Sequence, residues 1–255
     1  MILAIDAGNT HIVLGCLEAK RTRALARISN DPTKTTHEYA ILIRDVLDFE
    51  CIDIRELEGA IISSVVPAVT NTLRAAVRLL CRKEAMVLGG GIETGLNIRI
   101  DKPEQLGADL AVGAVAALAL CPPPLIVIDI GTATTITVID KEGAFRGGTI
   151  SPGPVLSMKA LAGSTAQLPE ISVDVPKHCI GTDTISCMHS GAIYGAAAML
   201  DGLIERMETE LGYSATLIAT GGLAACVLPH CHREIHYEPD LLLNGLKVIW
   251  DKNKK

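Results

Sequence analysis

The chain has 255 residues, of which 49% are hydrophobic, 3% aromatic and 20% charged, and its formal net charge is −6. This length and apolar content favour one large or two small packed domains and exclude a wholly disordered chain. Because lysines gather only at the C-terminus and no basic stripe precedes them, we do not expect a nucleic-acid partner.

The N-terminal residues 2–10 predict an apolar strand that ends in Asp6-x-Gly8, and a second strand follows over His11–Leu17 with a turn at 18–20. Asp6 interrupts the apolar run and no basic leader precedes it, so we expect no signal peptide. The eight cysteines are scattered without CxxC spacing. We therefore expect reduced thiols and a cytoplasmic protein.

The elements that follow alternate between strands and helices, which is typical of an α/β protein. The predicted ranges are a helix over Thr36–Phe49, a strand over Gly59–Val66, a helix over Pro67–Cys81, a strand over Ala85–Leu88, a helix over Thr184–Leu211, a strand over Ala215–Ala219 and a helix over Leu241–Trp250.

One uncharged stretch, Leu110–Ile128, is long enough to resemble a membrane span. Pro122, Pro123 and Pro124 divide it into a helix-sized and a strand-sized piece, so we expect buried interior and no membrane association. The same prolines mark the predicted domain boundary, with domains at 1–121 and 122–255.

A repeat links the two halves of the chain. Residues 125–133 again form an apolar strand ending in Asp129-x-Gly131, and Thr134–Ile139 reads as the second strand, as in the first half. A strand-Asp-x-Gly turn can recur by chance, but the shared order of elements favours two domains of similar architecture.

Each Asp-x-Gly turn exposes backbone N–H groups beside one carboxylate. Such N–H groups bind phosphate oxygens, and the carboxylate can hold a hydrated Mg²⁺. A lone copy is most often an ordinary hairpin, because turns favour Gly and Asp. Two copies in two domains suit a nucleoside triphosphate held between them. The other common phosphate-binding signature, a GxxxxGK[ST] loop, does not occur in the sequence.

Two further signals stand in the second half. Thr220-Gly221-Gly222 directly follows a predicted strand. Two interpretations stay open: a site where a flat ring or a phosphate lies against the backbone, and a plain turn. His230, Cys231, His232 and His236 resemble zinc ligands, but they lack a second spaced pair, so we do not expect zinc.

In their order and spacing, these motifs resemble those of the type III pantothenate kinases. The motifs are Asp6-x-Gly-Asn-Thr10, Ser63-Ser64-Val65-Val66-Pro67, Gly107-Ala108-Asp109, Asp129-x-Gly-Thr-Ala133-Thr134-Thr135, Gly147-Gly148-x-Ile150-x-Pro152-Gly153, Thr220-Gly221-Gly222 and Leu243-Asn244-Gly245-Leu246. The resemblance implies two ribonuclease-H-like domains of the actin-like ATPase and sugar kinase superfamily, with an ATP cleft between them. It also implies phosphorylation of pantothenate with ATP, the first step of coenzyme A synthesis, by a homodimer that needs Mg²⁺ and K⁺ or NH₄⁺.

For ATP, the resemblance implies a first phosphate hairpin over Asp6–Val13, with Asp6 holding Mg²⁺ through water and Asp129 holding the monovalent cation. The implied ATP-binding residues are Asp6, Ala7, Gly8, Asn9, Thr10, His11, Ile12, Val13, Thr132, Thr220, Gly221 and Gly222.

For the acceptor, the resemblance implies that Asp109 accepts the proton of the attacking alcohol. The implied acceptor-binding residues are Ile100, Gly107, Ala108, Asp109, Leu110 and Thr184. Without the family, Asp109 would be read as a helix cap, and so would Thr184. A position at a helix start would help to keep Asp109 ionised through the helix dipole.

The sequence departs from the family on the acceptor side, where Leu110 replaces an arginine and Ile100 replaces an aromatic residue. Leucine cannot replace a guanidinium that binds a carboxylate, although Arg99 or Lys102 could supply a charge nearby. Two alternatives therefore stay open, a non-catalytic nucleotide-binding regulator and a kinase of another small alcohol.

Overall fold

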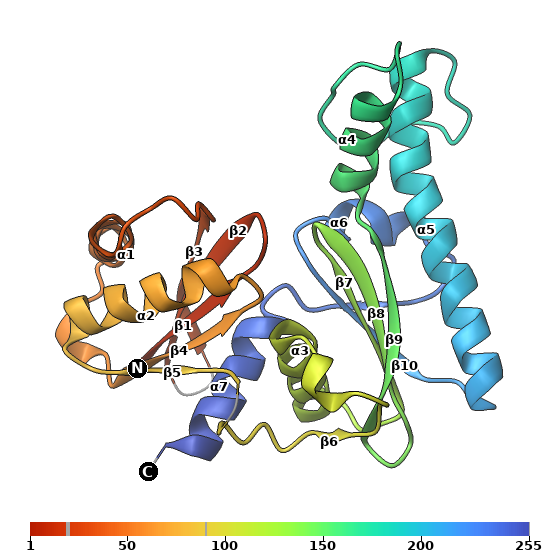
Figure 1. The fold of residues 1–255 in the computed structure, drawn as a ribbon. Coiled ribbons are helices and arrows are strands. Elements are labelled where there is room, and N and C mark those ends of the chain that lie inside the picture. The colour runs from red at the N-terminus through yellow and green to blue at the C-terminus, as the bar shows by residue number, and fades with distance from the viewer. Residues whose placement is uncertain (19–20, 90, 255) are drawn as a thin grey trace. The chain divides into compact units, whose positions relative to one another are not determined.

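A computed structural model describes residues 1–18, 21–89 and 91–254 (Figure 1). The predicted turn at 18–20 falls partly on residues 19 and 20, which lie outside the described residues. The chain forms two compact units, one of Met1–Leu96, Lys102–Ala119 and Asp240–Lys255, and one of Asn97–Asp101 and Leu120–Pro239. The domain division at residue 121 stays a prediction; the compact units assign 97–101 and 240–255 differently.

The first unit contains a five-stranded sheet in the order β3-β2-β1-β4-β5. In chain order its elements are β1 (Ile2–Ala7), β2 (His11–Glu18), β3 (Arg21–Ser29), α1 (Thr36–Phe49), β4 (Gly59–Ser64), α2 (Pro67–Cys81), β5 (Ala85–Val87), α3 (Ala108–Leu120) and α7 (Leu241–Asn253), with short 3₁₀ helices at Ile54–Glu56 and Pro103–Gln105. Strand β1 is antiparallel to β2 and parallel to β4, so the carboxyl ends of β1 and β4 lie at the same edge of the sheet.

Both faces of this sheet are covered. Alternate side chains of β1 and β4 point to opposite faces, and both faces are apolar. Helices α1 and α2 pack on the face that carries Leu3, Ile5 and Ile62. Helices α3 and α7 contribute to the cluster on the face that carries Ile2 and Ile61. The unit therefore buries the strands from both sides and leaves their carboxyl ends for the turns.

The second unit contains a six-stranded sheet in the order β11-β10-β7-β8-β9-β6. Its elements are β6 (Asn97–Ile98), β7 (Leu125–Ile130), β8 (Ala133–Ile139), β9 (Ala144–Pro152), α4 (Pro154–Ser164), α5 (Thr184–Leu211), β10 (Thr216–Thr220), α6 (Ala224–Val227), a 3₁₀ helix at Leu228–His230 and β11 (His236–Tyr237). Strand β7 pairs antiparallel with the next strand, β8, and parallel with a later strand, β10. Strand β1 has the same two kinds of neighbour in the first unit. Helices α5 and α6 pack on one face, and α4 lies beside the first turns of α5 (Figure 1).

Most predicted elements are confirmed. The helices over 36–49, 67–81 and 184–211 have the predicted bounds. Capping boxes explain two of the starts, with Thr35 and Glu38 before α1 and Asp183 and Ser186 before α5, whereas α2 begins at a proline, which suits the first turn. Strand β4 ends at Ser64 rather than at 66, because the hydroxyl of Ser64 accepts a hydrogen bond from Val66 N and starts the turn into α2.

The long uncharged stretch divides as predicted, into α3 and β7 on either side of the prolines. In the part of the chain that the structure describes, none of the helices combines the length and the apolar character that a membrane crossing requires.

Candidate active site

The first hairpin turn connects β1 to β2 in the first unit. Gly8 N donates to His11 O at 3.0 Å, and the side-chain amide of Asn30 donates to Gly8 O at 2.6 Å. Asn30 N also donates to Thr10 O at 2.9 Å. The sequence analysis did not identify Asn30, which braces the turn from the end of β3. The only available signal was its position just after that strand.

The predicted ATP-binding residues of this hairpin divide by exposure. Asn9, Thr10 and His11 are exposed at the turn, and Asp6 and Gly8 are partly buried. The side chains of Ala7 and Ile12 lie in the core, at 1% and 0% exposure, so these two residues present only their backbone to a ligand.

The second hairpin turn connects β7 to β8 in the second unit. Gly131 N donates to Ala133 O at 3.0 Å, and Gly153 N donates to Thr132 O at 3.0 Å. The end of β9 thus supports the turn that carries Thr132. A Cβ on Gly153 would lie 2.2 Å from Gly131 O, so this close approach accounts for the glycine after Pro152, which the sequence pattern contained without a role.

The Thr220-Gly221-Gly222 segment lies beside the second hairpin. Thr220 is the register partner of Asp129 on parallel strands β10 and β7. Gly221 has φ +103°, and a Cβ at this position would lie 2.5 Å from Asp129 Oδ1. Leu223 N donates to Ile130 O at 3.1 Å. The structure therefore brings Asp129 and the predicted adenosine motif together at one edge of the sheet, and only glycine permits this close approach.

Asp109 is the second residue of α3 in the first unit. Its Oδ1 accepts a hydrogen bond from Leu110 N at 2.8 Å, and a Cβ on Gly107 would lie 2.6 Å from the same oxygen. The carboxylate thus turns back over Gly107, which explains the glycine of the Gly-Ala-Asp motif.

The pKa of Asp109 differs from the expectation. We expected the helix start to favour ionisation, but burial raises the pKa of this carboxyl and outweighs the hydrogen bond from Leu110. Desolvation penalises the charged form more than one helix end stabilises it here. A carboxylate with a raised pKa is a stronger proton acceptor when ionised, which suits a general base.

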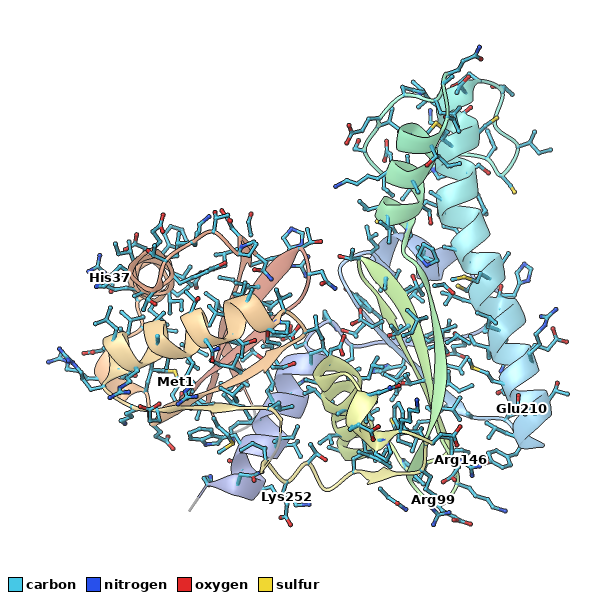
Figure 2. The ribbon with its side chains drawn as sticks, viewed as in Figure 1. Met1, His37, Arg99, Arg146, Glu210 and Lys252 are labelled. Carbon is cyan, nitrogen blue, oxygen red and sulfur yellow. The ribbon has the colours of Figure 1, made fainter. Side chains whose placement is uncertain are left out.

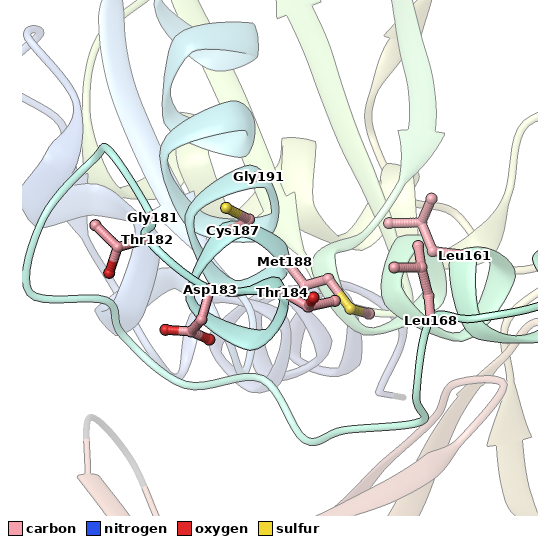
Figure 3. A pocket seen from close by; sticks show the side chains of 9 residues that line it. All are labelled: Leu161, Leu168, Gly181, Thr182, Asp183, Thr184, Cys187, Met188 and Gly191. Carbon is pink, nitrogen blue, oxygen red and sulfur yellow. The ribbon is translucent and has the colours of Figure 1, made fainter.

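Thr184 is exposed at the first position of α5. The alternative reading of Thr184 as a cap is wrong, because Asp183 is the N-cap and accepts from Ser186 N at 3.0 Å. Thr184 instead lines a pocket of about 560 Å³ between α4 and α5 (Figure 3). The pocket is lined by Leu161, Leu168, Gly181, Thr182, Asp183, Thr184, Cys187, Met188 and Gly191.

The two departures from the family pattern lie in different units. Leu110 is partly buried on α3. Ile100 belongs to the second unit, where its side chain approaches Gly147 of β9. Arg99, a proposed substitute for the missing arginine, pairs with Glu142 at 2.8 Å at the β8–β9 turn (Figure 2). Arg99 is therefore engaged in a structural ion pair.

The His230–His236 segment packs against α5 and forms polar contacts with it. The ring of His230 packs against Tyr194 at 4.7 Å, His232 N donates to Asp201 at 2.9 Å, and Arg233 pairs with Glu208 at 2.8 Å. Burial raises the pKa of the Cys231 thiol to about 11. Within residues 1–18, 21–89 and 91–254, no three His, Cys, Asp or Glu side chains cluster as a metal site would require.

Magnesium nevertheless fits the first hairpin. Mg²⁺ is usually held by one or two carboxylates, substrate phosphates and several waters, rather than by a protein cage. Asp6 supplies a partly buried carboxylate at a strand end, and the turn that follows it is exposed. In addition, the buried hydroxyl of Ser63, the register partner of Asp6, has no hydrogen-bond partner. The donor set is that of a nucleotide-bound metal.

Fold and site together define a two-unit α/β protein in which each unit carries an Asp-x-Gly turn between its first two long strands. A solved structure from Acidaminococcus fermentans, component A of (R)-2-hydroxyglutaryl-CoA dehydratase, matches 99% of this chain and 99% of its own with a TM-score of 0.60 at 18% identity, which shows the shared fold. The duplicated fold predicted from the sequence is confirmed.

The family follows from sequence relatives. The family model described as type III pantothenate kinase matches residues 2–206. Type III pantothenate kinases from Exiguobacterium sp. and Moorella thermoacetica are 43% and 37% identical to this chain, over 100% and 99% of it and 100% of their own lengths. The chain belongs to the type III pantothenate kinase family.

Proposed function

We propose that the hairpins at Asp6–Val13 and Asp129–Thr135 hold the triphosphate of one ATP molecule, and that Asp109 accepts the proton of the acceptor hydroxyl. Type III pantothenate kinases transfer the γ-phosphate of ATP to pantothenate, the first step of coenzyme A biosynthesis, and family membership assigns this phosphotransferase reaction to the chain. The full-length match to curated kinases carries this assignment. Nothing in the comparisons favours the non-catalytic alternative.

The proposed chemistry is positioning and proton transfer. The backbone N–H groups of the Gly8 turn bind phosphate oxygens, with Asn30 bracing the turn. Asp6 would hold Mg²⁺ through water, and the ion would supply positive charge to neutralise the phosphates. The primary hydroxyl of pantothenate attacks the γ-phosphorus while Asp109 Oδ takes its proton, ADP leaves, and 4'-phosphopantothenate is released.

The adenosine and monovalent-cation sites form the second part of the proposal. Gly221 and Gly222 present backbone to the adenosine, and Thr220 anchors the segment by donating to Pro239 O at 3.4 Å. Asp129, against Gly221, would hold K⁺ or NH₄⁺ beside the phosphates. A partly buried carboxylate at the strand end, with a close backbone neighbour, supports this position.

For the acceptor, we propose that Ile100, Gly107, Ala108, Leu110 and Thr184 contact pantothenate around Asp109. Because Arg99 is paired with Glu142, we expect pantothenate to be held without a guanidinium in place of Leu110. The altered-substrate alternative predicts instead that another small alcohol is phosphorylated faster.

One assay separates these readings. Purified protein with ATP, Mg²⁺ and K⁺ is given pantothenate or a panel of small primary alcohols, and the products are identified by mass spectrometry. We expect 4'-phosphopantothenate as the main product, and less of it when Na⁺ replaces K⁺. No product from pantothenate, in conditions where a family kinase is active, would contradict the acceptor assignment.

We also propose a cytoplasmic homodimer that contacts through the α4 and α5 end of the second unit. Ile150, Ile180 and Ile185 are 73%, 83% and 47% exposed there, together with Leu156 and Leu161 of α4. Such exposed apolar side chains mark interaction surfaces. Sedimentation equilibrium should give twice the chain mass, and Ile180→Asp should lower the dimer fraction; a monomeric mass at micromolar concentration would contradict this.

A further inference from the structure

The hydroxyl of Ser63 is unusual among the buried polar groups of this protein. Ser63 is completely buried in β4, and its Oγ has no hydrogen-bond partner. Among the described residues, only Thr134 Oγ1 and Thr149 Oγ1 share this property. Buried polar groups are nearly always paired, and an exception is costly, so each one calls for an explanation.

Ser63 lies beside Asp6. The two residues are register partners on parallel strands β4 and β1, at the carboxyl ends of both. Neighbouring strands are about 4.8 Å apart and paired residues point to the same face of a sheet, so the Ser63 hydroxyl and the Asp6 carboxyl lie side by side. The rest of this face contacts α3 through Val112 and Val115, one to two turns after Asp109.

The next residue, Ser64, provides a comparison, because its hydroxyl does have hydrogen-bond partners. Its Oγ accepts hydrogen bonds from Val66 N at 3.1 Å and from Thr70 Oγ1 at 2.8 Å, and so starts α2. Ser63 makes no comparable contact, although it is the more buried of the two. The local structure therefore accounts for Ser64 and leaves Ser63 without a structural role.

The second unit provides an internal comparison. Thr220 is the register partner of Asp129, as Ser63 is of Asp6, and its hydroxyl donates to Pro239 O. Both aspartates thus have a hydroxyl residue on the adjacent parallel strand. Of the two, only the hydroxyl beside the proposed magnesium position has no hydrogen-bond partner.

We propose that Ser63 is a positioning residue for Asp6: its hydroxyl donates to the Asp6 carboxylate when Mg²⁺ and nucleotide bind, and so fixes the carboxylate oxygen that faces the metal's water shell. The inference rests on the proposed function of the first hairpin. Residues that orient metal-binding groups in this way change metal affinity by about 10–100-fold when removed.

The test uses Ser63→Ala with Ser64→Ala as the matched control. ADP affinity is measured by calorimetry as a function of Mg²⁺, and the melting temperature is measured without nucleotide. For Ser63→Ala we expect a melting temperature equal to or above wild type, because the variant removes an unpaired buried hydroxyl. We also expect about 10-fold weaker Mg²⁺-dependent ADP binding and unchanged Mg²⁺-free ADP binding. Ser64→Ala should melt at a lower temperature and keep the wild-type Mg²⁺ dependence.

A double variant with Asp6→Asn completes the test. If Ser63 acts through Asp6, Ser63→Ala has no further effect on Mg²⁺ dependence in the Asp6→Asn background. An unchanged Mg²⁺ dependence in Ser63→Ala, or an equal loss in both backgrounds, overturns the proposal. Because the readout is ADP binding, it is separate from the acceptor assay, and a failure to phosphorylate pantothenate would leave it measurable.

Discussion

The two hairpins share a topology but differ in what stands next to them. In the first unit the closing pair is Ala7 and Ile12, and in the second it is Ile130 and Thr134, so the second turn is shorter by one residue. Each turn follows an aspartate with a hydroxyl-bearing register partner on a parallel strand. The duplicated frame therefore places the same pair of functional groups at the same edge of each sheet.

The two units differ in the residue that follows the hydroxyl-bearing register partner of the aspartate. In the first, Ser64 uses its side chain to start the 15-residue helix α2. In the second, Gly221 has no side chain and lies directly against Asp129. In the first unit a side chain thus holds the turn into the helix, whereas in the second the backbone itself lies against the aspartate. This difference matches the proposed roles, with phosphate and metal at the first hairpin and adenosine and monovalent cation at the second.

The largest effect should come from a residue outside both hairpins. If the hairpins only hold the nucleotide, Asp109→Asn should lower kcat by about 10²–10⁴-fold, the usual contribution of a general base, and leave ATP affinity near wild type. Steady-state kinetics and calorimetry measure the two quantities. Parallel loss of ATP binding would show that Asp109 has a structural role.

The raised pKa of Asp109 adds a pH dependence. The ionised carboxylate is the active form, so kcat/KM of the wild type should fall as pH drops through this raised pKa. For stability, the folded state binds the proton more tightly than the unfolded state, so ionisation lowers the free energy of unfolding as pH rises. Asp109→Asn should therefore melt no lower than wild type at neutral pH.

The second prediction contrasts the two aspartates. Asp6→Asn should raise the Mg²⁺ concentration needed for half-maximal activity by about 10–100-fold. Asp129→Asn should instead raise the K⁺ concentration needed for half-maximal activity. Titrations of each cation at saturating levels of the other measure both effects. The division of roles between the hairpins is wrong if the two variants give the same pattern.

A smaller effect is expected at Gly221. A methyl group there would meet Asp129 Oδ1 at 2.5 Å, and φ of +103° is unfavourable for alanine. Gly221→Ala should raise the KM for ATP by about 10-fold and lower the melting temperature, since positive-φ strain costs about 1–3 kcal/mol.

A control for this variant lies in the same glycine pair, one residue on. Gly222 is exposed, and its φ is not positive. Gly222→Ala should keep the wild-type melting temperature. Equal destabilisation by both variants would mean that neither the close approach nor the backbone angle of Gly221 is special.

Much of the fold could be predicted from local patterns. The helix over 184–211 has apolar spacing, a capping box at Asp183 and a left-handed Gly212 at its end, so its bounds follow from adjacent residues. The two Asp-x-Gly turns were also visible, because each follows a short apolar strand. The grouping of 240–255 with the first unit was not visible, because packing between distant segments leaves no local signal.

The site was predicted less completely, for a similar reason. The position of Asp109 at a helix start is a local property, but its raised pKa depends on burial by distant residues, and the expected direction was therefore wrong. Ser63 appeared in a motif without a role, since only the pairing of β1 with β4 places it beside Asp6. Neither the residue composition nor the spacing contains that pairing.

The packing of α7 on the first sheet has a consequence for biosynthesis. Ile2, Ala4 and Ile61 emerge from the ribosome long before Leu243, Leu246 and Ile249, which cover them. The first unit can therefore complete its interior only after residue 249 has left the ribosome, and until then it exposes an apolar surface that chaperones could recognise. Nascent chains stalled before residue 241 should remain protease-sensitive, and chains long enough to release α7 from the ribosome should be protected.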